Sequence, residues 1–171
     1  MEEFQKETET VQSQSEQNLS LDQLSGKTIL ISGATGMIGK CIIDLLMQYN
    51  NECAGNDQIQ IVALSRNEES AKKRLQEHWT KKSLHYLSCD VNTEIPECGQ
   101  ADYIIHAASN THPLQYSKDA VGTITSNVIG TKNLLDYAVS HRTGRFCFVS
   151  SVEIYGENRG NTDRFKEDYL G

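Results

Sequence analysis

The stretch that decides the fold is Ser32-Gly33-Ala34-Thr35-Gly36-Met37-Ile38-Gly39. It follows the apolar run 28–32, which is typical of a parallel strand buried on both faces, and it opens the helical pattern 37–49. Its small residues let the backbone turn tightly and approach a pyrophosphate, whose charge would meet free amides and the helix dipole. Because strand, loop and helix occur in this order, the stretch indicates a dinucleotide site rather than a structural turn.

The same loop does not fit the phosphate loop of nucleoside triphosphatases. That pattern, Gly-x-x-x-x-Gly-Lys followed by Ser or Thr, needs a glycine where this chain has Ala34 and a hydroxyl where it has Cys41. A nucleoside triphosphatase is therefore disfavoured.

Short apolar runs alternate with helical patterns along the rest of the chain. We predict strands at 59–64, 85–88, 103–106 and 145–150 and helices at 68–79 and 117–140, whereas 90–102 is too irregular to assign. This alternation predicts an α/β fold of the Rossmann type, a doubly wound parallel sheet with helices on both faces. Ligands bind such sheets beyond the carboxyl ends of the strands.

Two of the helices carry apolar residues at helical spacing, which predicts the face that each turns to the core. The stripe of helix 37–49 consists of Ile38, Ile42, Leu45, Leu46 and Tyr49. The stripe of helix 117–140 consists of Ile124, Val128, Thr131, Leu135, Ala138 and Val139.

The composition bounds the number of domains and the class of partner. The chain has 171 residues, 37% of them hydrophobic, enough for one core but not for a second large domain. Residues 1–25 hold six acidic residues and one lysine, −5 of the net charge of −7. We expect this polar tail to be disordered, with one turn at 19–24 packed on the domain edge as the alternative for its last part. We assign 26–171 to the dinucleotide-binding domain. Its 15 basic and 17 acidic residues give no basic field, which argues against nucleic acid as a partner.

Other segments of the sequence exclude further classes. There is no run of 18 apolar residues and no apolar leader, so we expect a cytoplasmic protein without a membrane partner. The five cysteines include no Cys-x-x-Cys pair and the five histidines lack ligand spacing, so we expect neither a disulfide framework nor a metal site. Cys41 and Cys147 lie in apolar segments, where we expect the thiols to be small buried hydrophobes.

The end of the second predicted strand bears on the choice of dinucleotide. A carboxylate there would accept hydrogen bonds from the adenosine ribose of NAD, whereas a nearby arginine would accommodate the 2′-phosphate of NADP. This chain has Ser65-Arg66-Asn67, which favours NADP over NAD unless Arg66 is simply a solvated surface cation.

Five local patterns together resemble those of the extended short-chain dehydrogenase/reductases, whose members are mostly nucleotide-sugar epimerases, dehydratases and decarboxylases. They span 28–156 and occur in the family's order. The patterns are the glycine loop 33–39, Cys89-Asp90-Val91, Asp102-Tyr103-Ile104-Ile105-His106-Ala107-Ala108, Asn127-Val128-Ile129-Gly130-Thr131 and Ser150-Ser151-Val152-Glu153-Ile154-Tyr155-Gly156. The resemblance implies a nicotinamide dinucleotide as cofactor and, for the parent protein, a nucleotide sugar as substrate.

The resemblance also assigns roles to individual residues. It implies cofactor contacts from Gly33, Thr35, Gly36, Met37, Ile38, Gly39, Ser65, Arg66, Asp90, Val91, Ala107, Ala108, Ser109, Asn127 and Ser150, and catalytic roles for Ser151 and Glu153. Asp90 could instead only cap a turn, and Glu153 could be an ordinary exposed carboxylate. His106 is expected to be a packed wall residue rather than an acid or base.

Two catalytic residues of the family have no counterpart here. The family uses a tyrosine and a lysine four residues later, but Tyr155 belongs to the Tyr-Gly pattern and is followed at that distance by Arg159, while Tyr169 lies near the end of the chain. We therefore expect an N-terminal fragment that is inactive by itself. The alternatives are a non-catalytic dinucleotide-binding sensor and a simple carbonyl reductase. Family members often pair through the long helix, so a homodimer is expected.

Overall fold

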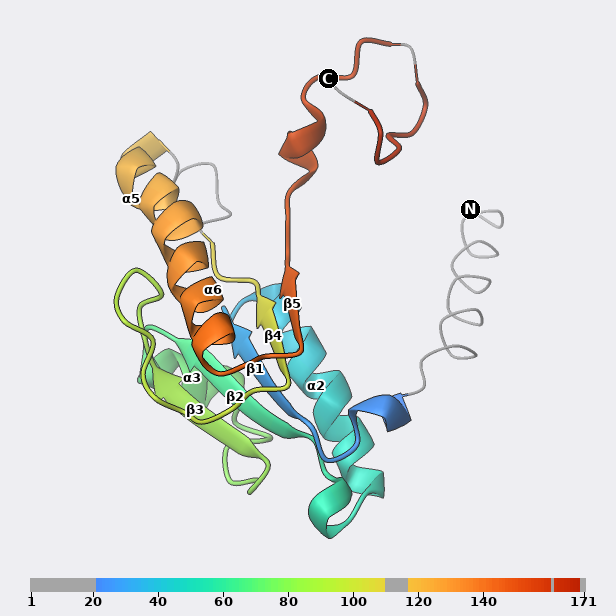
Figure 1. Ribbon diagram of the computed structural model, residues 1–171, viewed down its shortest axis with the longest axis vertical. Coiled ribbons are helices and arrows are strands. Elements are labelled where there is room, and N and C mark those ends of the chain that lie inside the picture. Colours follow the sequence, from blue (N-terminus) through green and yellow to red (C-terminus); the bar gives the residue numbers. More distant parts are fainter. Residues whose placement is uncertain (1–20, 110–116, 161, 170–171) are drawn as a thin grey trace.

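The computed structural model describes residues 21–109, 117–160 and 162–169 (Figure 1). Its centre is a parallel sheet of five strands in the order β3-β2-β1-β4-β5. The strands are β1 (Thr28–Ser32), β2 (Gln60–Ser65), β3 (Leu84–Ser88), β4 (Tyr103–His106) and β5 (Arg145–Phe148). The predicted doubly wound α/β sheet is confirmed.

Helices cover both faces of this sheet, as Figure 1 shows for α2 and α6. The helices are α2 (Met37–Glu52), α3 (Glu68–Arg74), α5 (Ala120–Thr125) and α6 (Thr131–Ser140), and the π-helical segment Ser126–Gly130 joins α5 to α6. Short 3₁₀ turns lie at Leu21–Leu24, Gly55–Asp57 and Val152–Tyr155.

Alternate residues of the strands feed two apolar clusters, one on each face of the sheet. Ile29 and Ile31 of β1 pack with Ile43 and Met47 of α2. Leu30, between them in sequence, packs on the opposite face with Leu134 of α6. These buried contacts fix both helices against the sheet.

The buried faces of α2 and α6 differ from the predicted stripes. In α2 the buried residues are Gly39, Ile43, Leu46, Met47 and Asn50, while Ile38 and Leu45 are exposed. The helix is rotated about its axis relative to the predicted stripe, because Gly39 lies against the carbonyl oxygen of Gly33 and so belongs to the buried face. In α6 the buried residues are Leu134, Tyr137 and Ala138, whereas Leu135 and Val139 are exposed.

Some predicted boundaries were also wrong. The helix from 68 ends at Arg74, not 79, because the chain turns at Leu75 and brings Trp79 against Tyr86, with 5.2 Å between ring centroids. The fifth strand ends at Phe148, and the long helix is interrupted by the π segment. Cys41 and Cys147 are exposed thiols, not buried ones, because Cys41 lies off the buried face of α2 and Cys147 lies on β5, the edge strand of the sheet.

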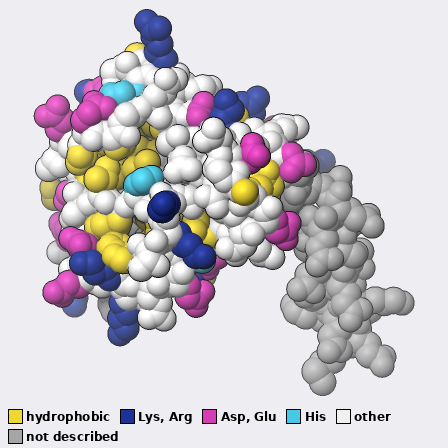
Figure 2. All heavy atoms as spheres, turned by 90° about the horizontal axis from the view of Figure 1, so that it is seen from below, with side chains coloured by type: hydrophobic (Ala, Val, Ile, Leu, Met, Phe, Trp, Pro, Cys, Tyr) yellow, Lys and Arg dark blue, Asp and Glu magenta, His cyan; other side chains and the backbone are white. Residues whose placement is uncertain are grey.

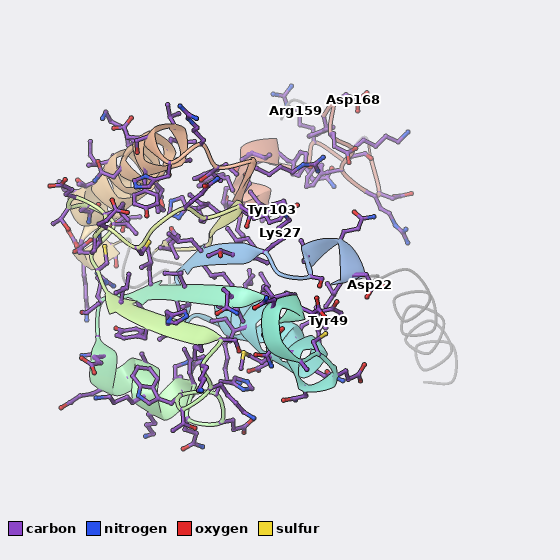
Figure 3. All side chains as sticks on the ribbon, turned by 60° about the horizontal axis from the view of Figure 1, so that its bottom comes forward. Asp22, Lys27, Tyr49, Tyr103, Arg159 and Asp168 are labelled. Carbon is purple, nitrogen blue, oxygen red and sulfur yellow. The ribbon has the colours of Figure 1, made fainter. Side chains whose placement is uncertain are left out.

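The start of the described chain packs on the domain. Leu21 and Leu24 contact the apolar cluster beneath α2, and the Tyr49 hydroxyl donates to Asp22 Oδ1 at 3.4 Å (Figure 3). Residues 21–24 therefore form the turn expected at the domain edge, and residues 1–20 of the expected disordered tail lie outside the described residues.

The described surface mixes charges of both signs. On the face in Figure 2, Lys and Arg side chains are interspersed with Asp and Glu side chains. Among the described residues, no helix combines the length and the apolar character needed to cross a bilayer.

Candidate functional site

A cavity of about 220 Å³ lies where β1, β2 and β4 end. The strand register brings Ser32 beside both Leu64 and His106, so the segments that follow these strands meet at one edge of the sheet. The chain passes to opposite sides of β1 here, which is the crevice where open α/β sheets bind ligands. The lining residues are Gly33, Thr35, Gly36, Leu64, Ser65, Arg66, Cys89, Asp90, Val91, Ala107, Ala108, Ser109 and Ser126.

The glycine loop forms one wall through close approaches of the backbone. Gly33 has φ +73°, and a Cβ on it would lie 2.5 Å from the carbonyl oxygen of Ala107. A Cβ on Gly39 would lie 2.3 Å from the carbonyl oxygen of Gly33. Side chains are thus excluded from both positions, and the turn stays tight enough to hold the start of α2 beside the cavity.

The first turn of α2 points its amides toward this loop. Gly36 is the N-cap residue, and no described side chain caps the turn. A 16-residue helix with free N-terminal amides presents a partial positive charge, which suits a phosphate group. Met37 and Ile38 of this turn expose their side chains, and neither residue is among those that line the cavity.

The second wall consists of Ser65 and Arg66 at the end of β2. The carbonyl oxygen of Ser65 accepts from the Tyr86 hydroxyl at 2.9 Å and from the Cys89 amide at 3.0 Å. Ser88 Oγ donates to the carbonyl oxygen of Arg66 at 3.3 Å. Strand β3 thereby fixes the backbone of this wall, while the Arg66 side chain remains exposed.

Asp90 and Val91 form the floor, and contacts with the π segment hold them in place. Asp90 Oδ1 accepts from the Asn92 amide at 3.0 Å, so this carboxylate caps a turn and lines the cavity at once. Asn92 Nδ2 donates to Ser126 Oγ at 3.2 Å. A Cβ on Gly130 would lie 2.6 Å from a methyl group of Val91, so this helix packs tightly on the floor.

Behind the loop, His106 joins three elements. Its Nδ1 lies 2.7 Å from Ser32 Oγ, and its Nε2 lies 3.0 Å from Thr131 Oγ1. Because the Thr131 hydroxyl donates to the carbonyl oxygen of Asn127, it must accept from His106, which assigns the proton to Nε2. Burial lowers the pKa of His106, so the ring is neutral at pH 7. It therefore suits the expected role of a packed wall residue.

The structure places the predicted cofactor residues unequally around the cavity. Met37, Ile38 and Gly39 lie in the first turn of α2, behind the lining residues. Asn127 also lies behind the lining, but its Oδ1 accepts from Ser109 Oγ at 2.8 Å. The other predicted contacts, except Ser150, line the cavity directly: Gly33, Thr35, Gly36, Ser65, Arg66, Asp90, Val91, Ala107, Ala108 and Ser109.

Three lining residues were not predicted from the sequence. Leu64 and Cys89 close the apolar runs of the second and third strands, so the rule that ligands lie beyond strand ends could have found them. Ser126 lines the cavity because the π segment packs beside the turn at 90–92, a contact between distant segments that no local sequence pattern predicts.

The predicted catalytic residues lie outside the cavity lining. Ser151 and Glu153, like the predicted cofactor residue Ser150, are exposed and follow β5, in the segment that leads away from the sheet in Figure 1. Ser151 Oγ accepts from the amide of Glu153 at 3.2 Å and caps the short turn Val152–Tyr155. Among the described residues, no group of three or more His, Cys, Asp or Glu side chains could hold a metal ion.

The model of the NAD-dependent epimerase/dehydratase family matches residues 29–170. The chain belongs to this family. Among curated members of the epimerase/dehydratase family, UDP-glucuronic acid decarboxylase 1 of Danio rerio is 31% identical over 153 residues, which cover 88% of this chain and 33% of that protein. UDP-glucuronic acid decarboxylase 3 of Arabidopsis thaliana is 34% identical over 130 residues, 75% of this chain and 35% of that protein. The chain thus spans about a third of the length of these relatives.

Solved structures share the epimerase/dehydratase fold. A double mutant of dTDP-glucose 4,6-dehydratase from Streptomyces venezuelae, with NAD and DAU bound, superposes with a TM-score of 0.69 at 23% identity, over 84% of this chain and 45% of that one. The UDP-Glc/GlcNAc 4-epimerase of Campylobacter jejuni gives a TM-score of 0.65 at 19% identity, over 85% and 43%. The resemblance to extended short-chain dehydrogenase/reductases is therefore confirmed.

Proposed function

We propose that this chain is the dinucleotide-binding part of an NAD(P)-dependent enzyme that converts a nucleotide sugar. The observation that carries the proposal is the glycine loop: at Gly33 and Gly39 only a hydrogen fits, and the loop sets uncapped helix amides beside a cavity at the sheet crevice. Such a cradle suits a pyrophosphate bridge.

The lining residues divide naturally along a dinucleotide. The amides of Ala34 and Gly36 already donate to the carbonyl oxygens of Leu64 and Gly33, so those of Thr35, Met37 and Ile38 would hold the pyrophosphate. Ser65 and Arg66 would hold the adenosine ribose, and Asp90 and Val91 the adenine. Ala107 to Ser109 would border the second ribose, with Asn127 supporting Ser109. A bound nicotinamide exchanges a hydride with a carbon of the substrate. The cavity is smaller than the ~300–1,000 Å³ of complete small-molecule sites, as expected if further parts of a longer protein close it.

The comparisons support a nucleotide sugar as the substrate class. Both curated relatives named above are UDP-glucuronic acid decarboxylases, and the dehydratase and epimerase structures also carry nucleotide-sugar names. Within this class, Ser151 would contact a sugar hydroxyl and Glu153 would serve as a further polar group. The choice among epimerase, dehydratase and decarboxylase depends on the sugar-binding residues.

We expect residues 1–171 alone to bind the cofactor without turnover. Ser151 and Glu153 lie apart from the cavity lining, and the tyrosine-lysine pair of the family has no counterpart in these residues. Four residues after Tyr155, which belongs to the Tyr-Gly pattern, lies Arg159, whose guanidinium stays protonated. A positioned acid-base pair contributes about 10²–10⁴ in rate.

Calorimetric titration of the chain with NAD⁺ and NADP⁺ tests the proposal. Saturable binding of at least one dinucleotide, lost on Gly33→Ala, is expected. Absence of heat and of retained dinucleotide with both ligands would overturn it.

A non-catalytic dinucleotide sensor is the second candidate, favoured by the exposed position of Ser151 and Glu153. The two candidates differ in the longer protein: an enzyme consumes a UDP-sugar when the dinucleotide is present, whereas a sensor binds the dinucleotide and leaves the sugar unchanged.

The exposed apolar stripe on α5, the π segment and α6 supports a homodimer. Val121, Ile124, Val128 and Val139 are 60–79% exposed and lie along one long helix. Val128→Glu should shift the chain to monomer in sedimentation velocity, while Val152→Glu, at an equally exposed valine outside this stripe, should leave the mass unchanged.

A further inference from the structure

Tyr86 stands directly behind Ser65 in the cavity wall. It lies on β3, where its backbone pairs with Ala63 of β2, two residues before Ser65. Its ring packs against Trp79, which holds it in place. The hydroxyl oxygen lies 2.9 Å from the carbonyl oxygen of Ser65 and 3.2 Å from Ser65 Oγ.

These two distances fix the direction of both hydroxyl protons. A phenol has one proton, and a carbonyl oxygen can only accept, so the Tyr86 proton goes to the carbonyl of Ser65. The opposite arrangement would leave two lone pairs facing each other at 2.9 Å. For the contact between Ser65 Oγ and the Tyr86 oxygen to be a hydrogen bond, the Ser65 hydroxyl has to donate, and in that arrangement it presents lone pairs to the cavity.

The direction of this hydrogen bond bears on the 2′ position of an adenosine ribose. A 2′-hydroxyl, as in NAD, can donate to the Ser65 lone pairs. A 2′-phosphate, as in NADP, offers only acceptor oxygens near neutral pH and would face those lone pairs. The guanidinium of Arg66 would attract a 2′-phosphate and so favour NADP. Its side chain is exposed, however, and charge contacts in solvent add little to binding affinity.

We infer that Tyr86 is a specificity-determining positioning residue: by taking the proton of Ser65, it makes the wall an acceptor and gives preference to NAD over NADP. This inference opposes the preference for NADP expected from Ser65-Arg66, because the sequence alone does not show that the serine proton is engaged. The inference rests on the proposed function, since Ser65 must face the ribose.

The test is a double-mutant cycle on the full chain, with calorimetric Kd values for NAD⁺ and NADP⁺. The wild-type chain should bind NAD⁺ more tightly. Tyr86→Phe keeps the ring on Trp79 but frees the serine proton to donate to a phosphate, and should shift the ratio of the two Kd values toward NADP⁺ by about tenfold.

Further variants show whether Tyr86 acts through Ser65. Ser65→Ala should weaken NAD⁺ binding more than NADP⁺ binding, and adding Tyr86→Phe to it should leave the ratio unchanged. Tyr49→Phe is the matched control, because it removes a hydroxyl that contacts Asp22 at the far end of α2 (Figure 3) and should not alter the ratio.

The outcomes separate this inference from the proposed function. If the wild type binds neither dinucleotide, the proposed function fails and the inference with it. If both dinucleotides bind but Tyr86→Phe leaves the ratio of their Kd values unchanged, only the inference fails. The same holds if Tyr86→Phe shifts this ratio by the same factor in the Ser65→Ala background. Should Tyr86→Phe not fold, Ser65→Ala decides alone: equal weakening of both dinucleotides would overturn the role of an acceptor at Ser65.

Discussion

The imidazole of His106 accepts a hydrogen bond from the hydroxyl of Ser32, with 2.7 Å between Nδ1 and Oγ. Both side chains are buried, Ser32 at the end of β1 and His106 at the end of the adjacent strand β4. The same ring donates to Thr131 of α6. One neutral side chain thus ties the two central strands and a covering helix together behind the glycine loop.

His106→Phe should lower the free energy of unfolding by about 2–4 kcal/mol. It preserves apolar volume but leaves the buried hydroxyl of Ser32 and the half-buried hydroxyl of Thr131 without this partner. Urea denaturation measures the loss. His85→Phe, at an exposed histidine of β3, is the control and should change the stability by less than about 0.5 kcal/mol. Equal losses in the two variants would contradict the role given to His106.

The pKa of His106 predicts how stability depends on pH. Burial lowers this pKa below its usual 6.5, so the unfolded chain binds the proton more readily than the folded one. The contribution of the neutral ring is complete above about pH 6.5 and is lost as pH falls toward the folded pKa, by at most about 1.4 kcal/mol per pH unit. The stability difference between wild type and His106→Phe should shrink over this window.

Proton NMR can follow the same ring directly. His106 should titrate below pH 6.5, whereas His141 should titrate above it, because its hydrogen bond to Glu97 raises its pKa. Glu97→Gln should lower the His141 midpoint and leave that of His106 unchanged. A common midpoint for both rings would contradict the buried position of His106.

Gly33→Ala should be more destabilising than Gly55→Ala, although both glycines have positive φ. At Gly55 no atom lies within 4 Å of the added Cβ, so the cost is the backbone conformation alone, about 1–2 kcal/mol. At Gly33 the Cβ meets the backbone of Ala107, which adds about 1–3 kcal/mol. Thermal denaturation of the two variants compares these costs. Equal losses of stability would show that the glycine loop can shift to accommodate the added Cβ.

Asn50→Ala should cost about 2–5 kcal/mol, because two backbone groups would lose their only described partner. The Asn50 side chain donates to the carbonyl oxygen of Ile59 at 2.7 Å and accepts from the Ile59 amide at 2.8 Å. Urea denaturation is the measurement, and Asn51→Ala, at the exposed neighbouring residue, is the matched control. Loss of less than about 1 kcal/mol would mean that water replaces the amide.

The sequence was informative where a single local pattern sufficed. Continuous apolar runs predicted the five strands within a few residues, and the loop 32–39 predicted the position of the cavity. Helix faces were harder to predict, because tertiary contacts select among several apolar stripes. Asn50, a polar residue, lies on the buried face of α2 because it clamps the start of β2.

Contacts between distant segments account for what could not be predicted at the site. His106 meets Ser32 across 74 positions, and Tyr86 meets Ser65 across 21. The direction of each proton follows only from the other partners of the same oxygen. The π segment at 126–130 has no distinctive composition, yet it brings Ser126 to the floor of the cavity.

The bend between Gly33 and Gly39 is closed by main chain meeting main chain. Met37, on the same bend, turns its side chain to solvent, with 82% of it exposed. The geometry of the amides is therefore independent of what position 37 displays. A library randomised at position 37 would therefore vary the surface beside the loop while keeping the anion-facing frame, which makes this position a suitable place to attach a reporter group.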